Sequence, residues 1–221
     1  MEDSVAAMRE KIARFGAMLF DRFLTDAAGG NISARVGDLI CITSRFSGQK
    51  YQWAIRPEQV LVVDADGNRL DGEGEISRES KVHLALYKQF PMASGVVHCH
   101  PRNVLPFCAA GVSIQPVLEA TWKFGEIKVT PYAPAHSPAL AGYVVDAIRG
   151  QEARITKHAA AVMARWHGLF VVGKDLDAAF DAVERIDTNA RIIMLSRSLE
   201  ANLDLADDWK DALARDMTAG E

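Results

Sequence analysis

Two histidines separated by one residue are the first feature of this sequence that could do chemistry. His98 and His100 end an apolar run that begins at Gly95, and Pro101 stops that run. Side chains two apart on a strand point to the same face, roughly 7 Å from each other, so both imidazoles can converge on one ion. Imidazole suits zinc and other first-row divalent metals. The pair therefore predicts two ligands of a metal site at an open strand end.

A third histidine and a glutamate strengthen this interpretation, which an isolated and short His-x-His motif would leave weak. His167 falls in a tight turn between two apolar runs and is followed by Gly168. A ring that can carry a charge is costly to bury there without a partner. Glu79 opens the helix that leads into the strand of His98. We therefore expect His167 and Glu79 to belong to the same site.

The other three histidines lack such a context. His83 lies one helical turn after Glu79 and is expected to pair with it or to pack in the interior. His136 and His158 lie in polar connecting segments and are expected on the surface.

The elements that position these side chains follow from the spacing of apolar residues. Ser137 is expected to cap a helix that has Pro138 at its first position. Strands that come in clusters, with helices between and around them, predict one layered αβα domain over residues 1–221. The helices are expected over 4–24, 78–90, 103–110, 137–149, from 175 onward and again from 201, and the strands over 32–36, 39–43, 60–64, 95–100, 159–164 and 169–172.

Composition excludes several classes of protein. The 221 residues carry a formal net charge of -4, so no basic field exists to attract nucleic acid. No run of 18 apolar residues is present, and the first residues are acidic where a signal peptide is basic. The three cysteines are irregularly spaced and predict no disulfide framework. We expect a soluble cytoplasmic protein without a nucleic-acid or membrane partner.

Five motifs resemble, in order and spacing, those of the class II aldolase/adducin family, and a late helix bearing Glu184 matches as well. The resemblance covers roughly residues 5 to 200. It implies a single class II aldolase-like α/β domain, with a mainly antiparallel central sheet covered by helices. It also implies a cyclic homotetramer with active sites between subunits. The motifs are residues 29–35, 77–79, 96–101, 131–133 and 167–173.

The resemblance also implies roles for individual residues. Glu79 resembles the acidic residue that ligates the empty metal and acts as the base once substrate displaces it. The implied activity is zinc-dependent retro-aldol cleavage of a ketose phosphate, similar to L-fuculose 1-phosphate, to dihydroxyacetone phosphate and an aldehyde through a metal-stabilised enediolate. Manganese or cobalt could replace zinc. The implied zinc ligands are His98, His100 and His167, and the implied phosphate pocket contains Gly30, Asn31 and Ser77.

Three positions depart from the family pattern. Arg78 replaces a small hydroxyl residue, and it could bind phosphate, bind a carboxylate, or form a solvated salt bridge. Ser47 and Gly48 supply the usual phosphate loop if residues 44–46 contain a short insertion. The tyrosine acid expected shortly after Pro116 is missing, and Glu119 is one candidate replacement.

Two other functions stay open at this level. A metal-dependent decarboxylase or sugar-phosphate epimerase on the same scaffold would use the same enolate stabilisation, and Arg78 would suit a carboxylated substrate. A non-catalytic adducin-like interaction module is the third option. The set of His98, His100, His167 and Glu79 argues against that option, because an inert module has no physical reason to keep an open metal site.

Overall fold

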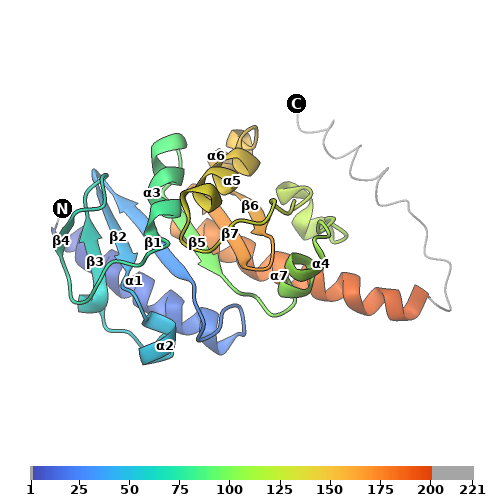
Figure 1. The fold of residues 1–221 in the computed structure, drawn as a ribbon, viewed down its shortest axis with the longest axis horizontal. Helices are drawn as coiled ribbons and strands as arrows, with labels where there is room; N and C mark the ends of the chain where they lie inside the picture. Colours follow the sequence, from blue (N-terminus) through green and yellow to red (C-terminus); the bar gives the residue numbers. More distant parts are fainter. Residues whose placement is uncertain (1, 201–221) are drawn as a thin grey trace.

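The computed structural model describes residues 2–200, and one seven-stranded sheet organises them (Figure 1). The strand order is β4-β3-β2-β1-β5-β7-β6, and every neighbouring pair is antiparallel. This confirms the α/β class and the antiparallel character of the sheet. The strands are β1 (Asn31–Val36), β2 (Leu39–Thr43), β3 (Val60–Val63), β4 (Arg69–Asp71), β5 (Gly95–Cys99), β6 (Ala159–Ala164) and β7 (Gly168–Gly173).

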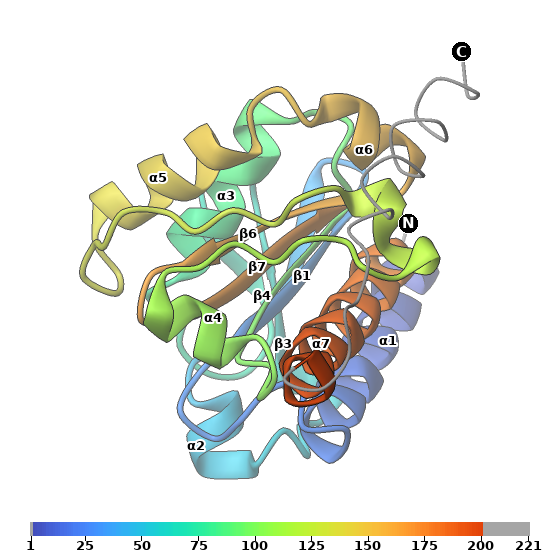
Figure 2. The ribbon, with the colours of Figure 1, turned by 90° about the vertical axis from the view of Figure 1, so that its right-hand side faces the viewer.

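Helices cover both faces of the sheet. Figure 2 shows α1 and α7 side by side on one face, with α3, α5 and α6 on the other. The predicted three-layer arrangement is therefore confirmed. The helices are α1 (Glu2–Asp21), α2 (Ser47–Tyr51), α3 (Ser80–Gln89), α4 (Leu105–Ala110), α5 (Pro138–Ile148), α6 (Glu152–Lys157) and α7 (Leu176–Glu200), with 3-10 turns η1 (Pro57–Gln59) and η2 (Glu119–Phe124).

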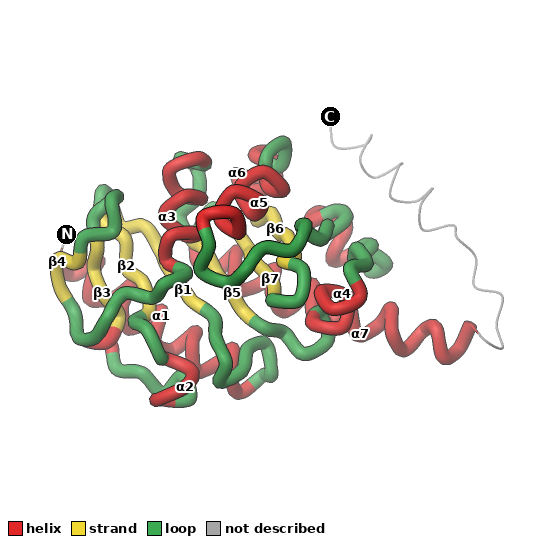
Figure 3. The backbone as a smooth tube through the Cα atoms, in the orientation of Figure 1, coloured by secondary structure: helices red, strands yellow, loops and turns green. Residues whose placement is uncertain are grey.

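Between α4 and α5 the chain runs mostly as loop (Figure 3). Two isolated bridges attach this long connection to the rest of the fold, Ile114 with Ile127 and Val129 with Met163. The connection brings its last residues, including His136, to the same end of the sheet as the other histidines.

Alternation along β5 decides which face carries the first histidine. Val97 and Cys99 point into the apolar core beneath α1 and α7, whereas Val96 points into the core beneath α3 and α5. His98 therefore emerges on the α3 side, since successive strand residues face opposite ways. There its ring stacks on Phe170 with 4.0 Å between centroids and 10° between planes.

Several element boundaries differ from the expected ones. The helix expected from residue 78 begins at Ser80, which leaves Glu79 at the N-cap position. The predicted cap of α5 is confirmed, because the backbone N–H of Leu140 donates to Oγ of Ser137 at 3.2 Å. The helix expected from residue 201 lies outside the described residues. Within residues 2–200, no helix is both long and apolar enough to span a bilayer.

Candidate metal centre and anion cavity

Three histidines from two separate parts of the chain converge at one end of the sheet. One ligand nitrogen from each of His98, His100 and His167 lies within 4.8 Å of the other two. His98 and His100 come from the end of β5, and His167 comes from the turn between β6 and β7. Their ring centroids are 5.1, 4.8 and 5.6 Å apart. The structure thus brings together all three residues that the sequence predicted as metal ligands.

Hydrogen bonds at the back of two rings leave their other nitrogens available. Nδ1 of His98 donates to the carbonyl of Leu169 at 3.0 Å, and Nδ1 of His100 donates to Oδ1 of Asp26 at 3.0 Å. A ring that donates through Nδ1 in its neutral form keeps a lone pair on Nε2. Both Nε2 atoms are buried without a hydrogen-bond partner among residues 2–200. Buried unpaired lone pairs of this kind fit a cation.

Glu79 places a carboxylate against His98 and His167. Oε2 lies 3.1 Å from Nε2 of His98, and Oε1 lies 3.1 Å from Nε2 of His167. Burial alone would raise the pKa of Glu79, but His98 and His167 together hold it well below its usual range, so the group is ionised. Burial lowers the pKa of His98 to about 4, against the Glu79 carboxylate, which raises it. Imidazoles beside one carboxylate fit a divalent metal.

Two glycines allow the backbone to pass close to this cluster. A Cβ on Gly168 would lie 2.6 Å from both the Cys99 carbonyl oxygen and Cδ2 of His100. Gly30 has a φ of 113°, and a Cβ there would lie 3.0 Å from the His98 carbonyl oxygen. No larger side chain fits either position without moving the end of β5, which carries His98 and His100.

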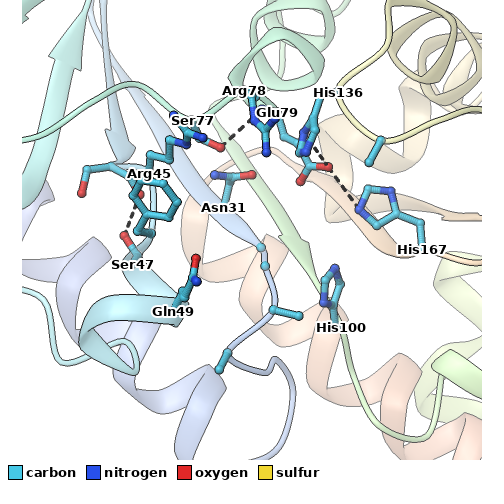
Figure 4. Close-up of a pocket in the computed structure, with 18 residues that line it drawn as sticks. Asn31, Arg45, Ser47, Gln49, Ser77, Arg78, Glu79, His100, His136 and His167 are labelled. Carbon is cyan, nitrogen blue, oxygen red and sulfur yellow. Dashed lines mark hydrogen bonds and ion pairs between the residues drawn. The ribbon is translucent and has the colours of Figure 1, made fainter.

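A cavity of about 330 Å³ opens beside the histidines (Figure 4). His98 is fully buried behind this cavity, whereas His100 and His167 reach its wall. The cavity also brings together every residue that was predicted to bind substrate. The wall contains Gly30, Asn31, Ser47, Gly48, Ser77, Arg78 and Glu79.

The neutral groups on the wall differ in what they offer a ligand. The side chain of Asn31 is almost fully buried, and its Oδ1 has no partner in the described part of the chain. Oγ of Ser77 accepts a hydrogen bond from the Glu79 N–H at 3.3 Å, which leaves its own proton to be donated. The hydroxyl of Ser47 instead donates to the Ser44 carbonyl at 2.7 Å, so its proton is used within the loop.

Two arginines give the cavity a positive wall. Arg78 is exposed and makes no hydrogen bond or ion pair with any other residue between 2 and 200, so the salt bridge considered for it has no partner here. Arg45, which the sequence interpretation passed over, also lines the cavity. It pairs with Glu75 at 2.9 Å and lies over the Phe46 ring, 4.3 Å from its centroid.

Two functional neighbours were missed in the sequence. Asp26, which holds His100, lies in a loop where its Oδ1 also accepts from Ala28 N at 2.8 Å. An aspartate followed by small residues is a typical turn signal, because its carboxylate accepts from the backbone two residues further on. This signal could have drawn attention to Asp26. His136 was expected on the surface, and 36% of its side chain is exposed. It lines the cavity, and its Nδ1 lies 3.5 Å from Oε1 of Glu79.

The remaining candidate residues lie elsewhere. His83 packs rather than pairs with Glu79, because its Nδ1 lies 2.7 Å from Oγ of Ser33, which in turn contacts the hydroxyl of Tyr87 at 2.9 Å. His158 is exposed, as expected. Glu119 is exposed at the start of η2 and does not line this cavity.

Comparison with known proteins connects this site to one family. The family model described as "Class II Aldolase and Adducin N-terminal domain" matches residues 10–194. The chain is 29% identical over 189 residues to L-ribulose-5-phosphate 4-epimerase UlaF of Salmonella paratyphi A, covering 81% of each protein. It is 27% identical to the 3-oxo-tetronate 4-phosphate decarboxylase of Haemophilus influenzae, covering 84% of this chain and 86% of the relative.

An aldolase and a solved structure complete the comparison. The chain is 26% identical to the 5-deoxy-D-ribulose 1-phosphate aldolase of Bacillus thuringiensis, covering 94% of this chain and 93% of the relative. An L-fuculose 1-phosphate aldolase structure superposes with a TM-score of 0.75 at 22% identity, covering 95% of each chain. That structural likeness supports the fold assignment alone. The relatives are named for three different reactions: epimerisation, decarboxylation and aldol cleavage. The residues of the site are needed to choose among these reactions for this chain.

Proposed function

Because this chain belongs to the class II aldolase and adducin family and is an enzyme of the aldolase type, we propose that it cleaves a ketose phosphate by a metal-dependent retro-aldol reaction. The products are dihydroxyacetone phosphate and an aldehyde, as for an L-fuculose 1-phosphate-like substrate. The observation that carries this proposal is the position of the Glu79 carboxylate between the histidine cluster and the cavity.

The residues at the site favour zinc as the metal. His98, His100 and His167 offer nitrogen ligands, and Asp26 orients one of them from behind. When bound, the cation supplies Lewis acidity that stabilises the negative charge of an enediolate. Manganese and cobalt are alternatives that the same donors accept. Metal analysis of the purified protein identifies which of zinc, manganese and cobalt is bound.

Glu79 is proposed as the group that moves the proton. In the condensation direction its carboxylate removes a proton from the carbon next to the substrate carbonyl. In cleavage a second group takes the proton of the hydroxyl that becomes the aldehyde oxygen, and the protonated form of Glu79 returns a proton to the same carbon. The low pKa of Glu79 keeps it ionised, which is the form that acts as the base in condensation. A positioned acid–base group of this kind contributes about 10²–10⁴-fold in rate.

Other groups on the cavity wall suit the phosphate. The Ser77 hydroxyl and the Arg78 guanidinium can donate to phosphate oxygens, and Gly30, Asn31 and Gly48 border the same space. The Ser47 hydroxyl must turn away from Ser44 before it can contribute. The acid that protonates the aldehyde oxygen is unassigned on this wall. Glu119 could serve only from a neighbouring subunit of the proposed homotetramer.

Decarboxylation of a carboxylated sugar phosphate is the second candidate. Its support is the arginine pair on the cavity wall, because Arg78 lacks a partner within the described residues and Arg45 lies in the same wall. A guanidinium binds a planar carboxylate through two parallel hydrogen bonds. Loss of carbon dioxide leaves an enolate that needs the same stabilisation. Epimerisation of a pentulose phosphate uses the same retro-aldol step without product release.

A substrate panel assayed with zinc-loaded protein tests the proposal. Release of dihydroxyacetone phosphate from ketose 1-phosphates supports the aldolase. Carbon dioxide from 3-oxo acid phosphates identifies a decarboxylase, and inversion of L-ribulose 5-phosphate identifies an epimerase. If none turns over while the metal is bound, the proposed catalytic function fails and the adducin-like module remains. Arg78→Ser further separates the aldolase from the decarboxylase. The substitution should abolish decarboxylation, whereas for aldol cleavage it should mainly raise KM.

A further inference from the structure

The backbone at His136 adopts a conformation that its residue type disfavours. His136 has a φ of 67°, in the left-handed region where a Cβ meets the following carbonyl. A residue with a Cβ is strained in this region and stays there only where the surrounding structure fixes it. The following residue, Ser137, donates its N–H to the Pro134 carbonyl at 3.2 Å and caps α5. The turn before α5 therefore holds His136 in this conformation.

This conformation directs the imidazole into the cavity. Nδ1 of His136 lies 3.5 Å from Oε1 of Glu79, the same oxygen that faces Nε2 of His167 at 3.1 Å. In Figure 4 the two imidazoles point toward the carboxylate, with His136 on the side of Arg78. Nδ1 is buried and has no hydrogen-bond partner within residues 2–200, although 36% of the side chain is exposed.

His136 stands apart from the metal-binding histidines. The group whose ligand atoms lie within 4.8 Å of one another contains His98, His100 and His167 but not His136. Its contact is therefore with the carboxylate and not with the ion site.

We propose that His136 is a positioning residue for Glu79, donating from Nδ1 to Oε1 when the carboxylate turns from the histidine cluster toward the cavity. This inference rests on the proposed role of Glu79 as the base. A displacement of less than 1 Å brings the two atoms from 3.5 Å to hydrogen-bond distance, which is about 2.7–3.2 Å. The hydrogen bond fixes the carboxylate at the carbon that exchanges its proton. Without that bond the carboxylate samples unproductive orientations, which lowers kcat more than it changes KM.

His136→Gly is the first test, because glycine adopts a φ of 67° without strain and the variant should therefore keep the fold. We expect its melting temperature to stay equal or rise, and its zinc content to stay at one ion per chain. We expect kcat to fall about 10- to 100-fold with KM changed less than about threefold. An unchanged kcat, or an effect confined to KM, would overturn the proposal.

His136→Asn is the rescue variant. Asparagine tolerates the left-handed region and carries an N–H donor at the same distance from Cβ as Nδ1 of histidine. We expect it to restore most of the lost kcat. If it is as impaired as His136→Gly, the imidazole itself transfers a proton and the positioning role is wrong. His158→Asn, at an exposed histidine away from the cavity, is the control and should match the parent enzyme.

A binding measurement provides a readout that does not depend on turnover. Phosphoglycolohydroxamate carries two adjacent oxygens that mimic an enediolate, and its affinity can be measured by calorimetry. We expect roughly tenfold weaker binding to His136→Gly and near-parental binding to His136→Asn; equal binding to all three proteins contradicts the proposal. Glu79→Gln separates failure of the proposed function from failure of the inference about His136. If Glu79→Gln keeps its activity, Glu79 is not the base. If Glu79→Gln is inactive while His136→Gly is fully active, only the role of His136 is excluded.

Discussion

Oδ1 of Asp26 lies 3.0 Å from Nδ1 of His100, so a carboxylate from a loop fixes an imidazole that lies 74 residues away in the chain. The hydrogen bond to His100 is the main reason that the pKa of Asp26 is lowered, and the carboxylate is therefore ionised. It holds the His100 ring in the tautomer and orientation that leave Nε2 facing the other two histidines.

Asp26→Asn should weaken metal binding without removing a ligand. Loss of such a supporting carboxylate typically lowers metal affinity about 10- to 100-fold. Competition with a chromophoric chelator measures the zinc dissociation constant. Asp38→Asn, which removes the same charge from an exposed turn between β1 and β2, is the control. Equal affinity in the two variants would show that Asp26 does not tune the site.

Glu79→Gln should keep the fold and the metal but remove turnover. Glutamine fills the same space between His98 and His167 yet cannot accept a proton at neutral pH. We expect kcat to fall by about 10²–10⁴-fold. Steady-state kinetics on the substrate found in the panel, together with zinc content and circular dichroism, check this. Turnover near the parental rate would disqualify Glu79 as the base.

Gly168→Ala should destabilise the protein and disturb metal binding together. The new Cβ would lie 2.6 Å from the Cys99 carbonyl oxygen and from Cδ2 of His100, so the strand or the ring must move. Overpacking of this kind costs about 1–3 kcal/mol. Gly142→Ala, inside α5 with no atom beyond its own helix backbone within 4 Å of the new Cβ, should instead stabilise by about 0.4–1 kcal/mol. Urea unfolding of the two variants, followed by zinc titration, tests the contrast.

The buried His83 should make the protein sensitive to acid. Burial lowers its pKa to about 3, whereas an unfolded histidine has a pKa of about 6.5. The neutral ring therefore stabilises the fold fully above about pH 6.5, and this contribution is lost as the pH falls toward 3. The loss amounts to about 1.4 kcal/mol for each pH unit in that window. Urea unfolding of metal-free protein should give a steeper pH dependence than the same measurement on His83→Gln; parallel curves would contradict the assignment.

The parts of the site that lie on regular elements could be predicted from the sequence. Alternation along β5 places His98 and His100 on one face, and the turn between two apolar strands brings His167 beside them. Local periodicity is sufficient there, because strand geometry fixes side-chain direction every second residue. The α1 and α7 layer followed in the same way from the spacing of apolar residues.

The parts of the site that lie on loops could not be predicted from the sequence. Asp26 reaches His100, and His136 reaches Glu79, through contacts between segments far apart in the chain. The positive φ of His136 leaves no trace in a hydrophobic pattern, and a histidine in a polar stretch is usually a surface residue. Helix α2 was missed for a related reason, since both residues that flank it, Phe46 and Gln52, are left-handed.

The pairing of Cys99 with Leu169 sets His98 and His167 side by side, although 69 positions separate them along the polypeptide. An unfolded chain offers a cation only the short His98–His100 pair, whereas the native state offers the whole set. By mass action, the divalent ion proposed above would act as a folding ligand: at one hundred times its dissociation constant it would add about 2.7 kcal/mol to the free energy of unfolding. We therefore expect the folded fraction of this protein to rise with the supply of that ion.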